Sequence, residues 1–138
     1  MQNDFSEYLV KDYEYWTVYV YQYQNYLGRC VVWCKREDAL DLTQATKEEQ
    51  KELFHILYEL KNAAETSFGA DWFNYSFFGN ETRHLHAHFV PRYSKPKTFF
   101  GTNFEDKLYG QNYVTDKEFT TSHELTQEVK SLLKQALN

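Results

Sequence analysis

The chain has 138 residues, of which 42% are hydrophobic and 19% aromatic. This is enough apolar material for one domain with a sizeable core, and it excludes an intrinsically disordered protein. A formal net charge of −5 gives no general attraction to nucleic acid or to an anionic membrane, so residues 1–138 are expected to form a single domain that binds neither.

Two neighbouring strands are predicted near the start of the chain. Residues 15–23 read Tyr-Trp-Thr-Val-Tyr-Val-Tyr-Gln-Tyr, a run rich in the β-branched and aromatic side chains that strands favour. A second strand is predicted over residues 29–35. Residues 25–28 between them predict a connection of about four residues, in which Gly28 can adopt a positive φ. The two strands should therefore pair in antiparallel fashion.

A long helix is predicted next. Thr46-x-x-Glu49 is a capping box, in which the hydroxyl and the carboxylate satisfy amide groups left unpaired at a helix start. One apolar stripe follows at helical spacing and should pack on the sheet; it consists of Leu53, Leu57, Leu60, Ala64 and Phe68. Gly69 predicts the end of this helix.

The second half of the chain predicts two more strands, over residues 73–78 and 83–90. Pro91 is expected to end the ladder pairing of the second of these strands because proline has no amide hydrogen. Residues 94–120 show no sustained period, so they predict an ordered but irregular segment that crosses the fold.

A C-terminal helix completes the predicted elements. Thr121-x-x-Glu124 is a second capping box. The apolar positions of this helix are Leu125, Val129, Leu132, Leu133 and Ala136. The predicted fold class is therefore α+β, with a single antiparallel β-sheet, a long helix packed on it and a C-terminal helix.

A cytoplasmic location is expected. Residues 1–5 contain no basic segment followed by an apolar run, and no stretch of the chain reaches the length of a membrane span. Cys30 and Cys34 would lie about 13 Å apart on one strand, which is too far for a disulfide. They are expected to be reduced, half-buried thiols, as is usual in the cytosol.

The most informative motif is His-Leu-His-Ala-His-Phe-Val over residues 84–90. Successive side chains of a strand point to opposite faces, so His84, His86 and His88 are expected to project together while the apolar residues between them turn to the core. Neutral imidazoles are costly to bury without partners, which suggests that a ligand occupies this face.

This motif resembles the signature of the histidine triad (HIT) superfamily, His-x-His-x-His with apolar residues between. Pro91-Arg92-Tyr93 resembles the continuation in bacterial HIT-like dinucleoside polyphosphate hydrolases. Upstream, residues 25–36 and 73–77 resemble the family's hairpin and the strand before the triad. The resemblance covers about residues 15–93.

The resemblance implies a nucleotide hydrolase or nucleotidyl transferase that needs no metal or other cofactor. His86, the middle histidine, would attack the α-phosphate of a purine nucleoside phosphate conjugate, such as a dinucleoside polyphosphate or a phosphoramidate, and form a covalent nucleotidyl-histidine. His84 and His88 would position the phosphate, neutralise its charge and move protons. The neutral and cationic forms of imidazole both suit this chemistry near pH 7.

Three departures from the family pattern affect the predicted substrate contacts. Arg29 follows the hairpin glycine where the family usually has histidine, and it is expected to bind the substrate phosphates, unless it only pairs with a carboxylate such as Glu37. Glu37 stands where many members carry another histidine. The loop before the triad is shortened to residues 79–83, in which Asn80 is the best candidate for a phosphate or leaving-group contact.

Other functions are compatible with the same residues. The chain could be a nucleotide-binding module without turnover, a histidine-rich metal-binding protein, or an assembly protein in which the histidines are structural. A homodimer is expected, because HIT-like proteins commonly pair through their long helix and adjoining strand. The helix also has more apolar residues than one narrow stripe contains, since Leu53, Phe54, Ile56, Leu57 and Tyr58 together spread over more than one side.

Overall fold

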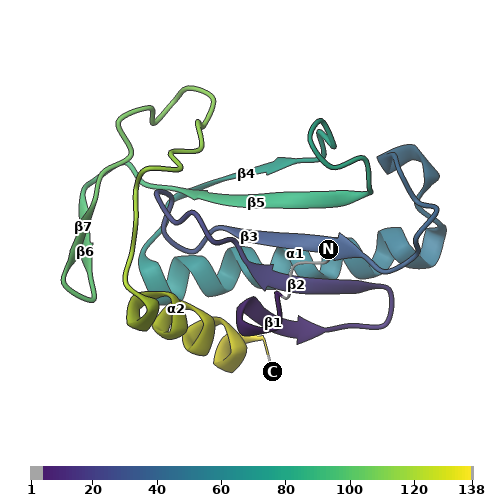
Figure 1. The fold of residues 1–138 in the computed structure, drawn as a ribbon, viewed down its shortest axis with the longest axis horizontal. Helices are drawn as coiled ribbons and strands as arrows, with labels where there is room; N and C mark the ends of the chain where they lie inside the picture. Colours follow the sequence, from purple (N-terminus) through teal and green to yellow (C-terminus); the bar gives the residue numbers. More distant parts are fainter. Residues whose placement is uncertain (1–4, 138) are drawn as a thin grey trace.

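The computed structural model describes residues 5–137. In chain order the elements are η1 (Ser6–Tyr8), β1 (Leu9–Asp12), β2 (Trp16–Val20), β3 (Cys30–Cys34), η2 (Leu42–Gln44), α1 (Lys47–Phe68), β4 (Trp72–Ser76), β5 (His86–Arg92), β6 (Lys97–Phe99), β7 (Thr102–Phe104) and α2 (His123–Ala136) (Figure 1). None of the helices in this part of the chain is long and apolar enough to cross a membrane.

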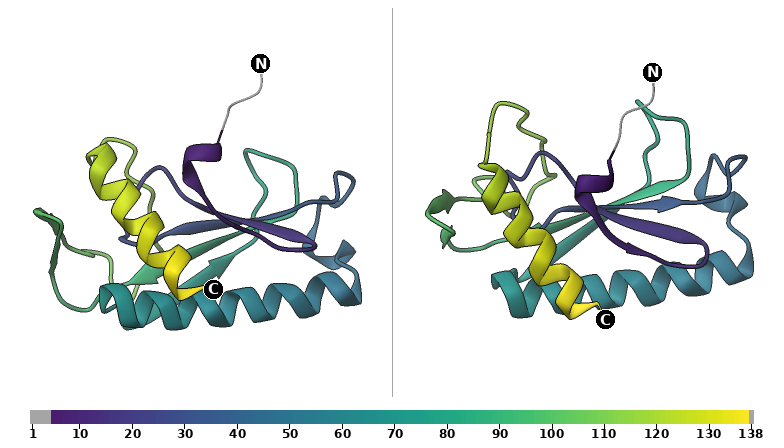
Figure 2. Two further views of the ribbon diagram at one scale, coloured as in Figure 1. Left: turned by 90° about the horizontal axis from the view of Figure 1, so that it is seen from below. Right: turned by 60° about the horizontal axis from the view of Figure 1, so that its bottom comes forward.

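Five strands form one antiparallel sheet in the order β1-β2-β3-β5-β4, and β6 and β7 form a separate hairpin. α1 runs along one face of the sheet, and α2 packs against α1 and β1 (Figures 1 and 2). On the other face, β3 and β5 are flanked by loops and η1 instead of by a long helix (Figure 2). The predicted α+β fold class is confirmed.

The long helix α1 forms as the sequence predicts. The Thr46 hydroxyl accepts a hydrogen bond from the Glu49 amide at 3.1 Å, and the Glu49 carboxylate accepts one from the Thr46 amide at 2.9 Å. Gly69 ends the helix with a left-handed φ of 76°. The predicted stripe is buried against the sheet; its members are Leu53, Leu57, Leu60, Ala64 and Phe68.

The predicted capping box of the C-terminal helix is wrong by one residue. Ser122 is the N-cap of α2, and its hydroxyl accepts from the Leu125 amide at 3.0 Å. The Thr121 hydroxyl instead lies 3.4 Å from that of Thr126. Serine and threonine are both good N-caps, so the packing of the helix decides between them. The buried apolar positions of the helix are Leu125, Val129 and Leu133, and Leu137 is buried just beyond its end in place of the predicted Ala136.

Three short strands were not predicted. β1 has four residues, and β6 and β7 have three each within the segment predicted to be irregular. Strands of this length do not contain enough residues to show an alternating period. They are specified by pairing, β1 with β2 and β6 with β7.

The strand that carries the histidines is displaced from its prediction. β5 spans His86–Arg92 instead of residues 83–90, and it continues through Pro91. The carbonyl of Arg92 accepts a hydrogen bond from the amide of Asp71, the residue before β4. The nitrogen of Pro91, which has no hydrogen, therefore faces the opposite side. On that opposite side lies β3. Its first residue, Cys30, pairs with Phe89, so β3 does not extend alongside Pro91. Pro91 therefore interrupts no ladder hydrogen bond.

The connection between β2 and β3 is longer than the four residues predicted, and buried Gln24 holds it together. The Gln24 amide donates to the carbonyls of Tyr21 and Arg29 at 2.7 and 2.8 Å and accepts from the Gly28 amide at 2.8 Å. Gly28 has the predicted positive φ, +89°, and a Cβ there would lie 2.8 Å from the Phe68 ring. This close approach fixes the hairpin end against α1.

Cys30 and Cys34 are free thiols on β3, as predicted, but they are fully buried instead of half-buried. Burial raises the pKa of both thiols. Both side chains belong to the core on the α1 side of the sheet.

Replacing Gly28 by alanine is expected to destabilise the protein more than the same change at Gly110. Both glycines have φ near +90°, but nothing lies within 4 Å of a Cβ at Gly110. Gly110→Ala should cost about 1 to 2 kcal/mol through backbone strain. Gly28→Ala should cost about 1 to 3 kcal/mol more through overlap with Phe68. Urea unfolding of both variants measures the difference, and equal losses would contradict the predicted overlap.

Candidate active site

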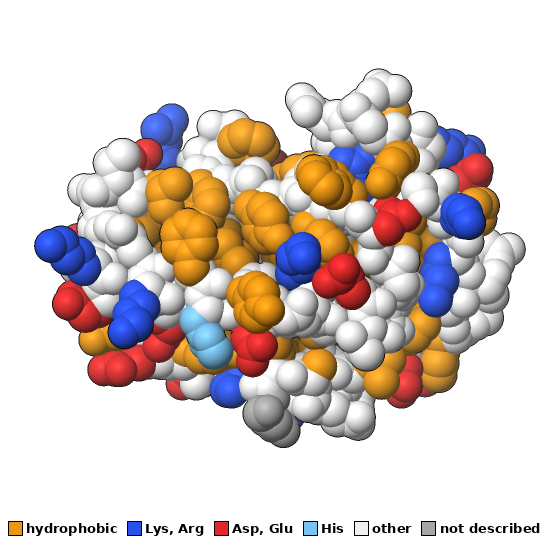
Figure 3. Space-filling view, turned by 180° about the vertical axis from the view of Figure 1, so that it is seen from behind, with side chains coloured by type: hydrophobic (Ala, Val, Ile, Leu, Met, Phe, Trp, Pro, Cys, Tyr) orange, Lys and Arg blue, Asp and Glu red, His pale blue; other side chains and the backbone are white. Residues whose placement is uncertain are grey.

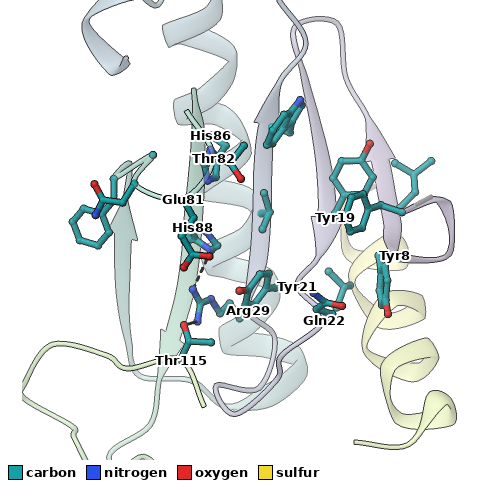
Figure 4. Close-up of a pocket in the computed structure, with 18 of the residues that line it drawn as sticks. Tyr8, Tyr19, Tyr21, Gln22, Arg29, Glu81, Thr82, His86, His88 and Thr115 are labelled. Carbon is teal, nitrogen blue, oxygen red and sulfur yellow. Dashed lines mark hydrogen bonds between the residues drawn. The ribbon is translucent and has the colours of Figure 1, made fainter. Parts of the chain in front are cut away.

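A cavity of about 1160 Å³ opens on the face of the sheet away from α1 (Figure 4). Its floor is the centre of the sheet, and its walls come from η1, the β4–β5 loop and two residues of the segment before α2. Four of the residues predicted for the site line this cavity: Arg29, Asn80, His86 and His88. His84 does not line it.

His86 is the first residue of β5 and pairs with Trp33 of β3. Its Nδ1 lies 2.6 Å from the carbonyl oxygen of His84. A carbonyl can only accept, so Nδ1 carries the proton in the neutral ring and Nε2 keeps its lone pair. His86 is 9% exposed, at the cavity floor. The site therefore contains an imidazole whose basic nitrogen has no hydrogen-bond partner within residues 5–137.

His84 lies before β5, which begins at His86, although the strand predicted over residues 83–90 included it. Its ring stacks on Trp33, with centroids 4.1 Å apart and planes at 17°. Its Nε2 donates to the Cys34 carbonyl at 2.6 Å. The side chain thus ties the end of β3 to the start of β5, while the backbone carbonyl orients His86. The sequence placed His84 at the phosphate, but its side chain is engaged elsewhere.

His88 follows two residues later on the same face of β5. Its Nδ1 lies 3.1 Å from Nη2 of Arg29. The His86 and His88 ring centroids are 5.3 Å apart at 69°, so the rings meet edge to face. Burial, followed by the charges of Arg29 and His86, lowers the pKa of His88 to about 3. His88 is therefore a neutral ring near pH 7.

Arg29 is 2% exposed, although it lines the cavity. Its Nη1 donates to the Thr115 hydroxyl at 2.7 Å, and the rings of Tyr21 and Tyr113 lie 4.3 and 4.8 Å from the guanidinium carbon. Its Nε has no hydrogen-bond partner. Among the described residues no carboxylate forms an ion pair with it, and Glu37 is exposed elsewhere on the surface. The cavity wall thus holds a buried cation without a counter-ion.

The segment before α2 supplies Tyr113 and Thr115 because Arg92 anchors it to β5. The Arg92 guanidinium forms an ion pair with Asp106 at 2.7 Å, and both side chains are almost fully buried. The Tyr113 hydroxyl lies 2.6 Å from that of Ser76 on β4. Sequence reasoning missed Tyr113 and Thr115, and no local pattern marks them, because their position results from contacts with distant residues.

The β4–β5 loop forms the rim of the cavity near His86. Asn80 is exposed there beside Glu81 and Thr82. Glu81 lies 4.0 Å from Lys117 of the segment before α2, and both side chains are exposed. Asn80 makes no hydrogen bond within residues 5–137. Its side chain is therefore exposed at the rim, and its contact with a phosphate or leaving group stays a prediction.

Aromatic side chains line the part of the cavity farther from the triad. They come from η1, its flanking residues and β2, and include Phe5, Tyr8 and Tyr19, whereas Trp33 of β3 lies beside His84 and His86. Sequence reasoning did not assign them to the site. The alternating pattern could have identified Tyr19, Tyr21 and Trp33, because residues at alternate positions of β2 and β3 share the face of the histidines. Residues 5–8 gave no such signal.

The three histidines do not converge on one point. Each is held by a different partner: Cys34, the His84 backbone or Arg29. Within residues 5–137, no three His, Cys, Asp or Glu side chains come together as a metal-binding group.

Comparisons with known proteins identify the family and the fold. The family model described as HIT domain matches residues 27–95, half of the chain. No curated protein sequence matches the chain.

Similar solved structures cover nearly all of the chain. A histidine triad protein from Bradyrhizobium japonicum is 18% identical, with a TM-score of 0.74 and coverage of 96% of this chain and 93% of that one. One from Sinorhizobium meliloti is 14% identical, with a TM-score of 0.77 and coverage of 93% and 87%. A protein from Sulfolobus tokodaii, described as a hypothetical histidine triad nucleotide-binding protein, is 16% identical, with a TM-score of 0.70 and coverage of 94% and 83%. At these identities the likeness establishes the fold alone. Together with the matching family model, the triad motif and the α+β fold show that the chain belongs to the histidine triad (HIT) family.

Proposed function

We propose that this protein is a HIT-type nucleotide hydrolase or nucleotidyl transferase that acts on the α-phosphate of a purine nucleoside phosphate conjugate. One observation carries the proposal. His86 offers a lone pair on Nε2 at the floor of a cavity, and the neighbouring His88, whose Nδ1 faces Arg29, has no hydrogen-bond partner on its other ring nitrogen within residues 5–137. A nucleophile and a hydrogen-bond donor thus lie side by side, as attack on a phosphate requires.

In the proposed first step, Nε2 of His86 attacks the α-phosphorus and forms a nitrogen–phosphorus bond. The bond to the leaving group breaks, and its electron pair departs with that group. The imidazole becomes cationic as it attacks, and the His84 carbonyl, which accepts from Nδ1, stabilises the developing charge. His88 donates to a phosphoryl oxygen, and Arg29 behind it adds positive potential.

In the second step, water attacks the same phosphorus and the bond to His86 breaks. The electron pair of that bond returns to the ring, which becomes neutral, the attacking water gives up one proton to the solvent, and a mononucleotide is released. If an acceptor other than water attacks, the same intermediate makes the protein a transferase.

The walls of the cavity support a nucleotide as the substrate. Phe5, Tyr8 and Tyr19 offer flat apolar surfaces suited to a purine base, and Asn80 at the rim is available to a phosphate or leaving group. The Sulfolobus tokodaii neighbour, described as nucleotide-binding, agrees with this substrate class. The runner-up function is a nucleotide-binding module without turnover, which release of a mononucleotide would exclude.

Replacing His86 should abolish turnover. His86→Ala is expected to lower the rate by on the order of 1000-fold or more, because no other group supplies the attacking lone pair. Release of mononucleotide from a panel of dinucleoside polyphosphates and nucleoside phosphoramidates is followed by mass spectrometry, which also seeks a nucleotidyl group on His86. His86→Asn, which can still donate to the His84 carbonyl, guards against misfolding of the alanine variant.

His55→Ala is the matched control, because His55 is exposed on α1, away from the cavity. It should retain the wild-type rate. If either His86 variant keeps a tenth of that rate, the assignment of His86 as nucleophile is wrong.

Turnover is expected to survive incubation with EDTA, because the proposed steps use only side chains and water. The measurement is the rate before and after chelation, followed by addition of zinc. A loss that zinc reverses would favour a metal site and contradict the proposed mechanism.

We also propose that two copies pair through α1 and β4. β4 is an edge strand of the sheet. A hydrophobic surface lies beside it on the face seen in Figure 3; it is lined by Leu42, Gln50, Leu53, Phe54, Leu57, Tyr58, Lys61, Tyr75 and Phe77. Phe54 is 73% and Tyr58 63% exposed, whereas the other apolar residues predicted for the interface mainly face the chain's own sheet. Such a patch calls for a partner surface.

Sedimentation at micromolar concentration should give twice the 16.6 kDa mass of the chain. The double variant Phe54→Glu, Tyr58→Glu should sediment as a monomer, because two buried charges oppose pairing. Phe100→Glu is the control, since Phe100 is 55% exposed on the β6–β7 hairpin. A wild-type monomer would refute the proposed dimer.

A further inference from the structure

The contact between Arg29 and His88 fixes the position of a proton. A guanidinium has five hydrogen-bond donors and no acceptor, so Nδ1 of His88 must accept from Nη2 across the 3.1 Å that separates them. The neutral ring then carries its proton on Nε2. We propose that Arg29 is a positioning residue that acts through His88 and holds this ring in the single neutral tautomer with its proton on Nε2. Figure 4 shows the contact between the two side chains.

Arg29 is itself held in place from several sides. Thr115 binds Nη1, and the rings of Tyr21 and Tyr113 lie within 5 Å of the guanidinium carbon. The side chain is 2% exposed, so it cannot turn away from His88 without breaking these contacts. A planar, permanently charged group held in this way imposes one hydrogen-bond direction on its neighbour.

The same burial argues against a direct role in holding the substrate. Both terminal nitrogens of Arg29 are already engaged, and aromatic rings lie close to the guanidinium. Nε, which has no partner among the described residues, is buried, so it is out of reach of a phosphate in the cavity. Arg29 therefore acts on the substrate indirectly, through the His88 ring that it orients and through its positive charge.

Other ionisable groups around His88 do not offset the effect of Arg29 on its ring. His86 lies beside it on β5, Tyr21 meets its ring edge to face at 5.1 Å, and Tyr113 lies beyond Arg29. Glu81 and Lys117 near the rim lie within 4.0 Å of each other. The pKa of His88, lowered to about 3 by burial, by Arg29 and by His86, agrees with a ring that stays neutral.

This arrangement gives the two neighbouring rings opposite tautomers. His86 donates from Nδ1 to a carbonyl and keeps the Nε2 lone pair, whereas His88 accepts at Nδ1 and keeps the Nε2 proton. His88 is then a fixed donor to a phosphoryl oxygen and does not compete as a base. The catalytic meaning of this contact rests on the proposed function, but the position of the proton can be measured without any substrate.

The test is nitrogen-15 NMR of the histidine side chains in the ligand-free protein, with the signals of His88 assigned by their loss in His88→Gln. In the wild type, His88 should show the limiting shifts of one tautomer, protonated at Nε2, and should not titrate between pH 8 and 5. Protonation at Nδ1, or titration of the ring in this range, would overturn the proposal.

Arg29→Met removes the donor and keeps an unbranched side chain of similar length. His88 should then show averaged shifts of two tautomers, and its pKa should rise by at least one unit, a tenfold gain in proton affinity. Arg83→Met is the matched control, because Arg83 is exposed in the β4–β5 loop and its loss changes the net charge equally. It should leave His88 unchanged. An unchanged His88 spectrum in Arg29→Met would also overturn the proposal.

Kinetics distinguish this proposal from the proposed function. With a substrate that the wild type turns over, Arg29→Met should raise the Michaelis constant about tenfold, equivalent to about 1.4 kcal/mol of binding. If the wild type turns over no nucleotide conjugate, the proposed function fails, while the NMR result still decides the role of Arg29.

Discussion

The pairing of β3 with β5 is the constraint on which the site depends. Its register sets Trp33 opposite His86 and Val31 opposite His88. β5 also pairs with β4 on its other side, so the strand that carries the two histidines is fixed from both directions. In such a central strand the side chains can neither slide nor turn to the other face without breaking two ladders.

Hydrogen bonds to the ring nitrogens add a second constraint, on the orientation and protonation of the histidine rings. The Cys34 carbonyl holds the ring of His84, and the carbonyl of His84 in turn orients His86. Arg29 performs the corresponding task for His88 from the opposite direction. Because a carbonyl accepts and a guanidinium donates, two identical side chains acquire different roles. Second partners of this kind determine which nitrogen of a histidine can react.

Completion of the cavity depends on one buried ion pair at the far end of β5, between Arg92 and Asp106. The Arg92 guanidinium binds Asp106, the Asn74 side chain, and the carbonyls of Leu108 and Gln111. A buried ion pair is costly unless its remaining hydrogen-bonding groups are satisfied, and here they largely are. The result is a segment without regular structure that is nevertheless fixed, and that brings Tyr113 and Thr115 over the sheet to hold Arg29.

The sequence by itself determined the features that repeat or that act over a few residues. The α1 stripe, its capping box, Gly69 and the alternation of His86 and His88 could be read directly, because helical and strand periods and caps are local. Only the tertiary structure decided that β5 begins at His86 and runs through Pro91, because the neighbouring strands set the limits of β5. It alone decided that Trp33 and Cys34 hold His84 and that Arg29 faces His88 with Thr115 behind it. These contacts join residues 50 to 86 positions apart, and no local pattern encodes such distances.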